Sequence, residues 1–243
     1  MKTNRIIINQ GLFILTIFLL AVFSGCDVFG ERGNGKTSSE TRAVSTFNSI
    51  DVSGAFDVYI TQGTVQSVIV ETDENLQKFI KTKVEDNILH IETREPISHY
   101  TCMKIHLTVT ELKKIDVSGA VDIRTENKLT VPDLFIDASG AADAKMDLAV
   151  QKLKIDCSGG SKLKFSGTAG EVRLDASGAV DLFAYDLVAE SVYLEISGAG
   201  KAEINVTKIL DAEISGAGSV RYKGSPEKVM ENVSGAGSIK RAD

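Results

Sequence analysis

The stretch that decides the fold is "IDVSGAVDIRT" at 115–125, because the chain carries it in eight variants. Apolar and polar residues alternate on both sides of a Ser-Gly-Ala step, a pattern typical of two short strands joined at a glycine bend. From Ser118 onward the motif returns every 18–21 residues. A motif repeated at a fixed period indicates an architectural unit rather than a catalytic signature. The eight motif serines are Ser53, Ser118, Ser139, Ser158, Ser177, Ser197, Ser215 and Ser234.

One such unit is too short to bury a core by itself, but units stacked in register can do so. The positions three before, one before and five after each motif serine are apolar in every copy, apart from Glu231 in the last one. We expect these three columns of side chains to point inward. The sequence therefore predicts an all-β fold, a right-handed parallel β-helix with coils of about 19 residues and a mostly β N-terminal lobe.

Two outward columns carry acidic residues. The column two residues before the motif serine contains Asp116, Asp137, Asp156 and Asp175, which we take as a candidate ligand or cation face. Carboxylates on adjacent coils could share a calcium ion. A second acidic column lies four residues after the serine and includes Asp57, Asp122, Asp143 and Asp181. No other cofactor is indicated, and no spacing of Cys and His supports a structural zinc site.

The chain begins with basic residues, an apolar run from Leu12 to Phe23 and the sequence "FSGC" at 23–26. This order is typical of a secretory signal peptide. The last four residues resemble the lipobox of bacterial lipoproteins, which implies lipid attachment at Cys26 and a membrane as partner. The polar segment that follows has the composition of a flexible tether. We predict a signal peptide at 1–25 and a tether at 26–43.

The repeat is interrupted between the first and second motif copies, and several segments there alternate like strands. We predict an N-terminal β lobe at 44–114 that covers one end of the repeat region at 115–243. "EDN" at 85–87 favours a hairpin turn. Asp73 is expected to cap one or two helical turns at 74–80.

Together with the lipobox-like start, "FDVYITQG" at 56–63, "LHI" at 89–91 and the serial "SGA" units resemble the head GIN domain family of adhesin-like auto-transporter proteins. The resemblance covers about 45–240. It implies a two-lobed β-helical fold and a lipoprotein. The family defines no catalytic set, so only Cys26 is carried over, from the lipobox.

The net charge of −6 argues against nucleic acid as a partner, because phosphate binding depends on basic side chains. Cys102 and Cys157 are interpreted as small buried side chains. The sequence favours a non-catalytic adhesion, binding or structural module of the cell envelope, lipid-anchored at the outer membrane, the periplasmic face or the cell surface. For a binding role, the expected ligand is a glycan or a protein. The alternatives are a β-helical polysaccharide lyase or hydrolase, disfavoured by the absence of Trp, and a calcium-binding surface protein.

Overall fold

The computed structural model describes residues 30–242, and its regular structure there is β apart from one short 3-10 helix, η2 (Gln77–Phe79). The all-β class predicted from the sequence is confirmed. No helix in this range is long and apolar enough to cross a membrane. The strands are β1 (Glu31–Arg32), β2 (Thr37–Thr41), β3 (Ser49–Gln62), β4 (Ser67–Asp73), β5 (Ile80–Glu85), β6 (Ile88–Thr93), β7 (Ile97–His99), β8 (Met103–Val109), β9 (Lys114–Thr125), β10 (Leu129–Gly198), β11 (Lys201–Gly216), β12 (Ser219–Lys223), β13 (Lys228–Gly235) and β14 (Ser238–Arg241).

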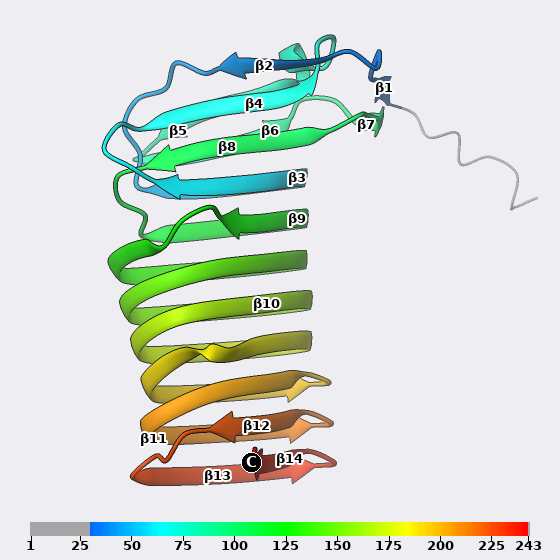
Figure 1. Cartoon of the computed structure of the whole chain (residues 1–243). Coiled ribbons are helices and arrows are strands. Elements are labelled where there is room, and N and C mark those ends of the chain that lie inside the picture. Colours follow the sequence, from blue (N-terminus) through cyan, green and yellow to red (C-terminus); the bar gives the residue numbers. More distant parts are fainter. Residues whose placement is uncertain (1–29, 243) are drawn as a thin grey trace, which may run out of the picture.

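Twelve of these strands form one sheet, and the repeats within it pair in parallel and in register. Ile50 of β3 lies beside Ile115 of β9, which in turn lies beside Ile136 of β10. The same register links β10 to β11, where Leu194 pairs with Ala212. Strand β10 contains 70 residues, and its ribbon winds through several stacked turns (Figure 1).

The motif glycines allow these turns to pack closely. Gly119 has φ +105, a conformation that side chains with a Cβ rarely adopt. A Cβ at this position would also overlap the carbonyl oxygen of Gly54 in the preceding repeat. Gly140 stands in the same relation to Gly119, and Gly159 to Gly140. The column of glycines therefore brings the backbones of successive repeats together at the bend.

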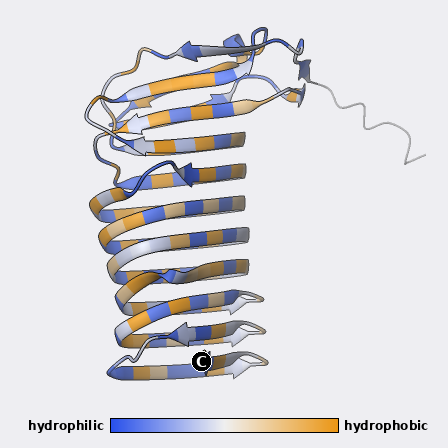
Figure 2. Cartoon of the chain, viewed as in Figure 1, coloured by the Kyte–Doolittle hydropathy of each residue, from blue (hydrophilic) through white to orange (hydrophobic). Residues whose placement is uncertain are grey.

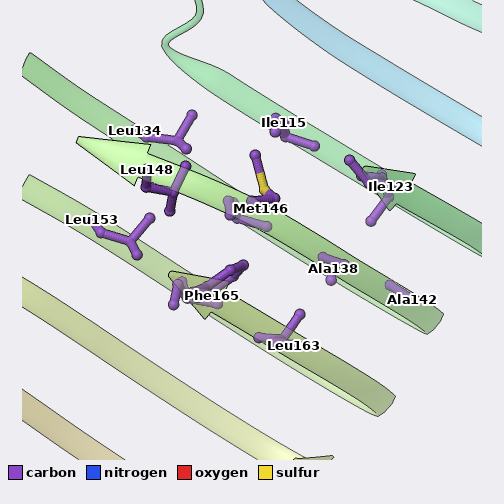
Figure 3. Close-up of a cluster of buried hydrophobic side chains, with 14 of the residues drawn as sticks. Ile115, Ile123, Leu134, Ala138, Ala142, Met146, Leu148, Leu153, Leu163 and Phe165 are labelled. Atoms are coloured by element: carbon purple, nitrogen blue, oxygen red, sulfur yellow. The ribbon is translucent and has the colours of Figure 1, made fainter. Parts of the chain in front are cut away.

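The apolar columns point inward, as predicted. Ile50, Ile115 and Ile155 are fully buried, and the strands alternate in hydropathy along the stack (Figure 2). Side chains from successive turns gather between the ribbons, as the cluster around Phe165 shows (Figure 3). In the last repeat Val233 is 41% exposed, because no further repeat within residues 30–242 covers it.

The N-terminal lobe closes one end of the stack with a change of strand direction. β8 still pairs in parallel with β3, but β4 pairs antiparallel with β8. β5 and β6 form an antiparallel hairpin. Its turn contains Asp86 and Asn87 with positive φ, which confirms the hairpin turn predicted at 85–87.

Two predictions near this end of the stack are wrong. The tether predicted at 26–43 is contradicted at 37–41, because these residues form β2, which pairs antiparallel with β4. Asp73 does not cap η2 through its side chain. It is fully buried and accepts hydrogen bonds from the Gly35 backbone N–H and from Thr101. A buried carboxylate needs such donors, and these were not visible from the local sequence. The predicted signal peptide and Cys26 lie outside the described residues.

Candidate binding site

Two outward faces of the stack meet at the glycine bend. The upstream face consists of the outward residues that precede each motif serine, such as Lys114, Asp116 and Phe135. The downstream face consists of the outward residues that follow it, such as Asp122 and Arg124. Parallel pairing places equivalent residues on neighbouring coils about 4.8 Å apart. Each face therefore presents columns of residues from equivalent positions of the repeat.

The predicted face of Asp116, Asp137, Asp156 and Asp175 is the acidic column of the upstream face. Asp116 and Asp137 are register neighbours, as predicted from the period. Lysines bind two members of this column: Lys114 Nζ lies 2.8 Å from Asp116 Oδ2, and Lys154 Nζ lies 2.7 Å from Asp156 Oδ2. The hydrogen bond that Lys114 donates to Asp116, helped by the negative charges of Asp137 and Asp51, raises the pKa of Lys114. Asp116 and Asp156 are thus already neutralised by the chain itself.

Asp175 lies apart from these ion pairs, in a shallow depression of about 160 Å³. The depression continues toward the end of the chain with Glu195 and Glu213. Within residues 30–242, no group of three or more His, Cys, Asp or Glu side chains is placed to hold a metal ion. The upstream face therefore has the character of an ion-paired surface at one end and an acidic depression at the other.

A larger cleft lies on the other side of the bend, where the lobe meets the stack. It has a volume of about 510 Å³. One wall is the segment from Tyr100 to Lys104, and the other is the bend of the first three repeats with Asp57, Asp122 and Asp143. The remaining lining residues are mostly small or apolar: Ala55, Phe56, Ala120, Val121 and Ala141.

The three carboxylates of the cleft come together because of the repeat register. Asp57 lies beside Asp122, and Asp122 lies beside Asp143. Burial, followed by the charges of Asp143 and Asp57, raises the pKa of Asp122. Like charges at this spacing disfavour full ionisation. The column thus offers several hydrogen-bond acceptors and, on the central carboxyl, a site that holds a proton more readily.

On its other side Asp57 neighbours Lys104 of β8. Lys104 Nζ is held 2.9 Å from Glu71 Oε1, and this hydrogen bond raises the pKa of Lys104. His106 Nε2 lies 3.0 Å from the other oxygen of Glu71. Hydrogen bonds from Lys104 and then His106 lower the pKa of Glu71. The lysine at the edge of the cleft is therefore fixed in place and charged.

The buried Asp73 fixes the wall of the cleft that consists of residues 100–104. Thr101 donates to Asp73 through its backbone N–H, at 2.7 Å, and through its hydroxyl, at 3.0 Å. The neighbouring Tyr100 is 45% exposed, so its ring is available to a ligand. Burial and the charge of Glu71 raise the pKa of the Cys102 thiol, which keeps it protonated. The cleft thus combines an exposed aromatic ring, next to the fixed Thr101, with a row of carboxylates.

The sequence reveals the second acidic column, but the upstream column is the one chosen as the candidate ligand or cation face. The cleft needs the segment at 100–104, which has no repeat and no motif, so the sequence gives no signal that it overhangs Asp57, Asp122 and Asp143. None of the three histidines lines this cleft. His90 instead lies with its Nδ1 atom 2.9 Å from Asp51 Oδ2.

The family model described as "Putative auto-transporter adhesin, head GIN domain" matches residues 46–226. The chain is similar to a crystal structure of "a putative adhesin" from Bacteroides fragilis, with 30% identity and a TM-score of 0.84 over 88% of this chain and 100% of that one. A "putative adhesin" from Parabacteroides merdae is 25% identical, with a TM-score of 0.67 over 88% and 99% of the two chains.

A "Putative lipid binding protein" from Parabacteroides distasonis shares the fold, with 22% identity and a TM-score of 0.70 over 88% of this chain and 99% of that one. No curated protein matches the chain.

Proposed function

Since this chain belongs to the family of "Putative auto-transporter adhesin, head GIN domain" proteins, we propose that it is a non-catalytic binding module of the cell envelope that holds a glycan in the cleft between the lobe and the stack. The observation that carries this proposal is the placement of Tyr100 opposite the Asp57, Asp122 and Asp143 column. Sugar hydroxyls donate hydrogen bonds to carboxylates, and the apolar face of a sugar ring packs on an aromatic side chain. A ligand site of this kind needs few polar groups, held rigidly.

The rigidity of the site supports binding. The aspartates sit on paired strands, while Asp73 holds Thr101, beside Tyr100. A preorganised site loses less conformational entropy when it binds a ligand. A protein ligand remains the second candidate for the same cleft.

One observation favours polysaccharide cleavage as an alternative function. The raised pKa of Asp122 beside two other carboxyls is a property that a general acid needs. The family and its adhesin relatives favour a non-enzyme. Calcium binding by the upstream column has less support, because lysines already bind Asp116 and Asp156.

Lipid attachment at Cys26 and cleavage of residues 1–25 belong to the same proposal, as do the envelope locations given above. The first described residues support a particular orientation: Glu31 pairs with Ile97 at the lobe. An anchor just upstream would therefore place the lobe toward the membrane and the repeats away from it.

We also propose that the repeat region at 115–243 is a right-handed parallel β-helix and that 44–114 is a separate lobe built on its first coil. The support is the parallel, one-repeat register of β3, β9, β10 and β11. Left-handed winding of the coils in an experimental structure would contradict this assignment.

The test is retention of the full chain, solubilised in detergent, on an array of bacterial and host glycans. Tyr100→Ala and Asp122→Asn should each abolish retention. Tyr193→Ala and Asp175→Asn are matched controls on the upstream face and should retain binding. Loss of retention only in Asp175→Asn would place the binding site in the upstream depression. If a retained glycan is shortened by the wild type but not by Asp122→Asn, the protein is an enzyme. If the chain captures a protein and no glycan, the ligand of the cleft is a protein.

A further inference from the structure

The downstream face carries a row of basic side chains that the cleft does not use. Arg124 and Lys145 are register neighbours on adjacent coils. Lys164 occupies the next place, because it follows Gly159 by the same number of residues as Lys145 follows Gly140, and these glycines stack. All three side chains are exposed. They form what we call the basic row: Arg124, Lys145 and Lys164.

The basic row differs from the basic residues of the upstream face in its pairing. Upstream, three cations pair with a carboxylate two residues away: Lys114–Asp116 at 2.8 Å, Lys154–Asp156 at 2.7 Å and Arg173–Glu171 at 2.7 Å. On the downstream face the same spacing separates Arg124 from Asp122 and Lys145 from Asp143. Yet no residue of the basic row forms an ion pair with any residue between 30 and 242.

Aromatic rings extend the basic row at both ends. Tyr59 is the register neighbour of Arg124, and its ring stacks on His106 with centroids 5.1 Å apart. At the other end Phe183 follows Lys164 by one repeat. Lys162 and Lys201 flank the Phe183 ring, with ammonium groups 5.7 and 5.2 Å from its centroid. The row is thus a line of three free cations between two flat rings.

Resting on the proposed glycan-binding function, we propose that the ligand is an acidic polysaccharide that leaves the cleft and runs along the stack axis on the basic row. The cations repeat about every 4.8 Å, the coil spacing, so a chain with regularly spaced acid groups can meet them in succession. Its ring faces can pack on Tyr59 and Phe183. Its hydroxyls can face the neighbouring column of Asp122 and Asp143, which accepts hydrogen bonds.

That acidic column also argues for a glycan over other polyanions. A nucleic acid or an anionic membrane surface presents dense phosphate, which Asp122 and Asp143 would repel. A polysaccharide alternates acid groups with hydroxyls, so it can satisfy the basic row and the acidic column together. Carboxylate and sulfate groups both have the required charge, and the test separates them.

The experiment measures affinity of the full chain in detergent for polygalacturonate, dextran sulfate and uncharged dextran. We expect one of the two acidic polymers to bind at least tenfold more tightly than dextran, with an affinity that falls as salt rises. The triple variant Arg124→Ala, Lys145→Ala, Lys164→Ala should lose at least tenfold affinity. The matched triple Lys114→Ala, Lys154→Ala, Arg173→Ala removes the same charge from the upstream face and should stay within twofold of wild type.

Three results would overturn the proposal. Equal losses in both triples would show an effect of net charge alone. Tighter binding to anionic lipid vesicles or DNA than to either acidic polymer would exclude a glycan as the preferred ligand. Equal affinity for dextran and the acidic polymers, with binding still dependent on Tyr100 and Asp122, would overturn only the acidic preference and leave the cleft function standing. Thermal unfolding of both triples checks that the fold is unchanged.

Discussion

The two ends of the stack are finished in different ways. At the N-terminal end, β8, β4 and β2 continue the sheet beyond the first coil and then reverse direction. At the C-terminal end, β13 pairs only with β11 and β14 only with β12, so the last coil has a free edge within the described residues. The consequence is visible in one column: Val52 at the closed end is fully buried, whereas Val233 at the open end is 41% exposed.

This difference shows what a repeated sequence can and cannot do. Each SGA unit presents the same apolar columns and the same glycine bend, so it can be extended by another unit. No unit can cover its own core. Ending the stack takes residues that depart from the repeat, and among residues 30–242 only the N-terminal lobe supplies a full layer of them. We therefore expect a stability gradient from the closed end to the open end.

The largest effect should come from the same glycine substitution made near each end. A Cβ on Gly119 or on Gly235 would overlap the carbonyl oxygen of the preceding coil, and both residues have positive φ. Gly119→Val should cost about 3 kcal/mol or more, because coils lie on both sides of it. Gly235→Val should cost about 1 kcal/mol or less, because only the last coil has to move. Urea unfolding gives both values, and equal costs would contradict the gradient.

The next largest effect concerns the inward columns. Ile50→Ala removes a fully buried side chain at the closed end and should cost about 2–5 kcal/mol. Val233→Ala makes a similar change in the last coil but should cost less than about 0.5 kcal/mol, because the side chain already contacts solvent. Chemical unfolding of the two variants provides the measurement. A cost above 2 kcal/mol for Val233→Ala would mean that something covers the open end in solution.

A third prediction tests the anchor of the closed end. The backbone N–H of Thr101, with the Thr101 hydroxyl and the Gly35 N–H, lowers the pKa of the buried Asp73. Asp73→Asn replaces an acceptor with a group that donates toward these donors, so it should cost about 1.5–3 kcal/mol at pH 7. The folded pKa lies below the unfolded one, so this stabilisation is complete above about pH 4 and is lost as pH falls through the folded pKa.

The melting temperatures of wild type and Asp73→Asn should therefore converge as pH is lowered below 4. Asp175→Asn is the control, because its side chain faces the upstream surface and should leave the melting temperature nearly unchanged at pH 7. A difference between wild type and Asp73→Asn that stays constant from pH 7 to pH 3 would show that the charge of Asp73 does not contribute.

The same contrast explains what could be predicted from the sequence. The inward columns and the acidic columns follow from the period alone, so the sequence correctly predicts that Ile115 is buried and that Asp116 lies beside Asp137. The lobe has no period, and its decisive contacts join residues far apart in the chain. Asp73 reaches Gly35 and Thr101, and Tyr100 overhangs Asp122. The local pattern therefore predicts a helix cap at Asp73 and a tether at 26–43, whereas long-range pairing makes Asp73 a buried anchor and turns 37–41 into a strand.

The smallest effect on stability, and the most specific to the open end, concerns its charges. A free strand edge can pair with another molecule, and lysines on such edges oppose that pairing. Lys228 and Lys240 are exposed on β13 and β14. Replacing both with Thr should change the free energy of unfolding by less than about 0.5 kcal/mol but should promote self-association, measured by light scattering against concentration. Replacing Lys145 and Lys164 with Thr removes the same charge from coils that are paired on both sides. If that control associates equally, loss of net repulsion is the cause, and the edge of the last coil has no special part in it.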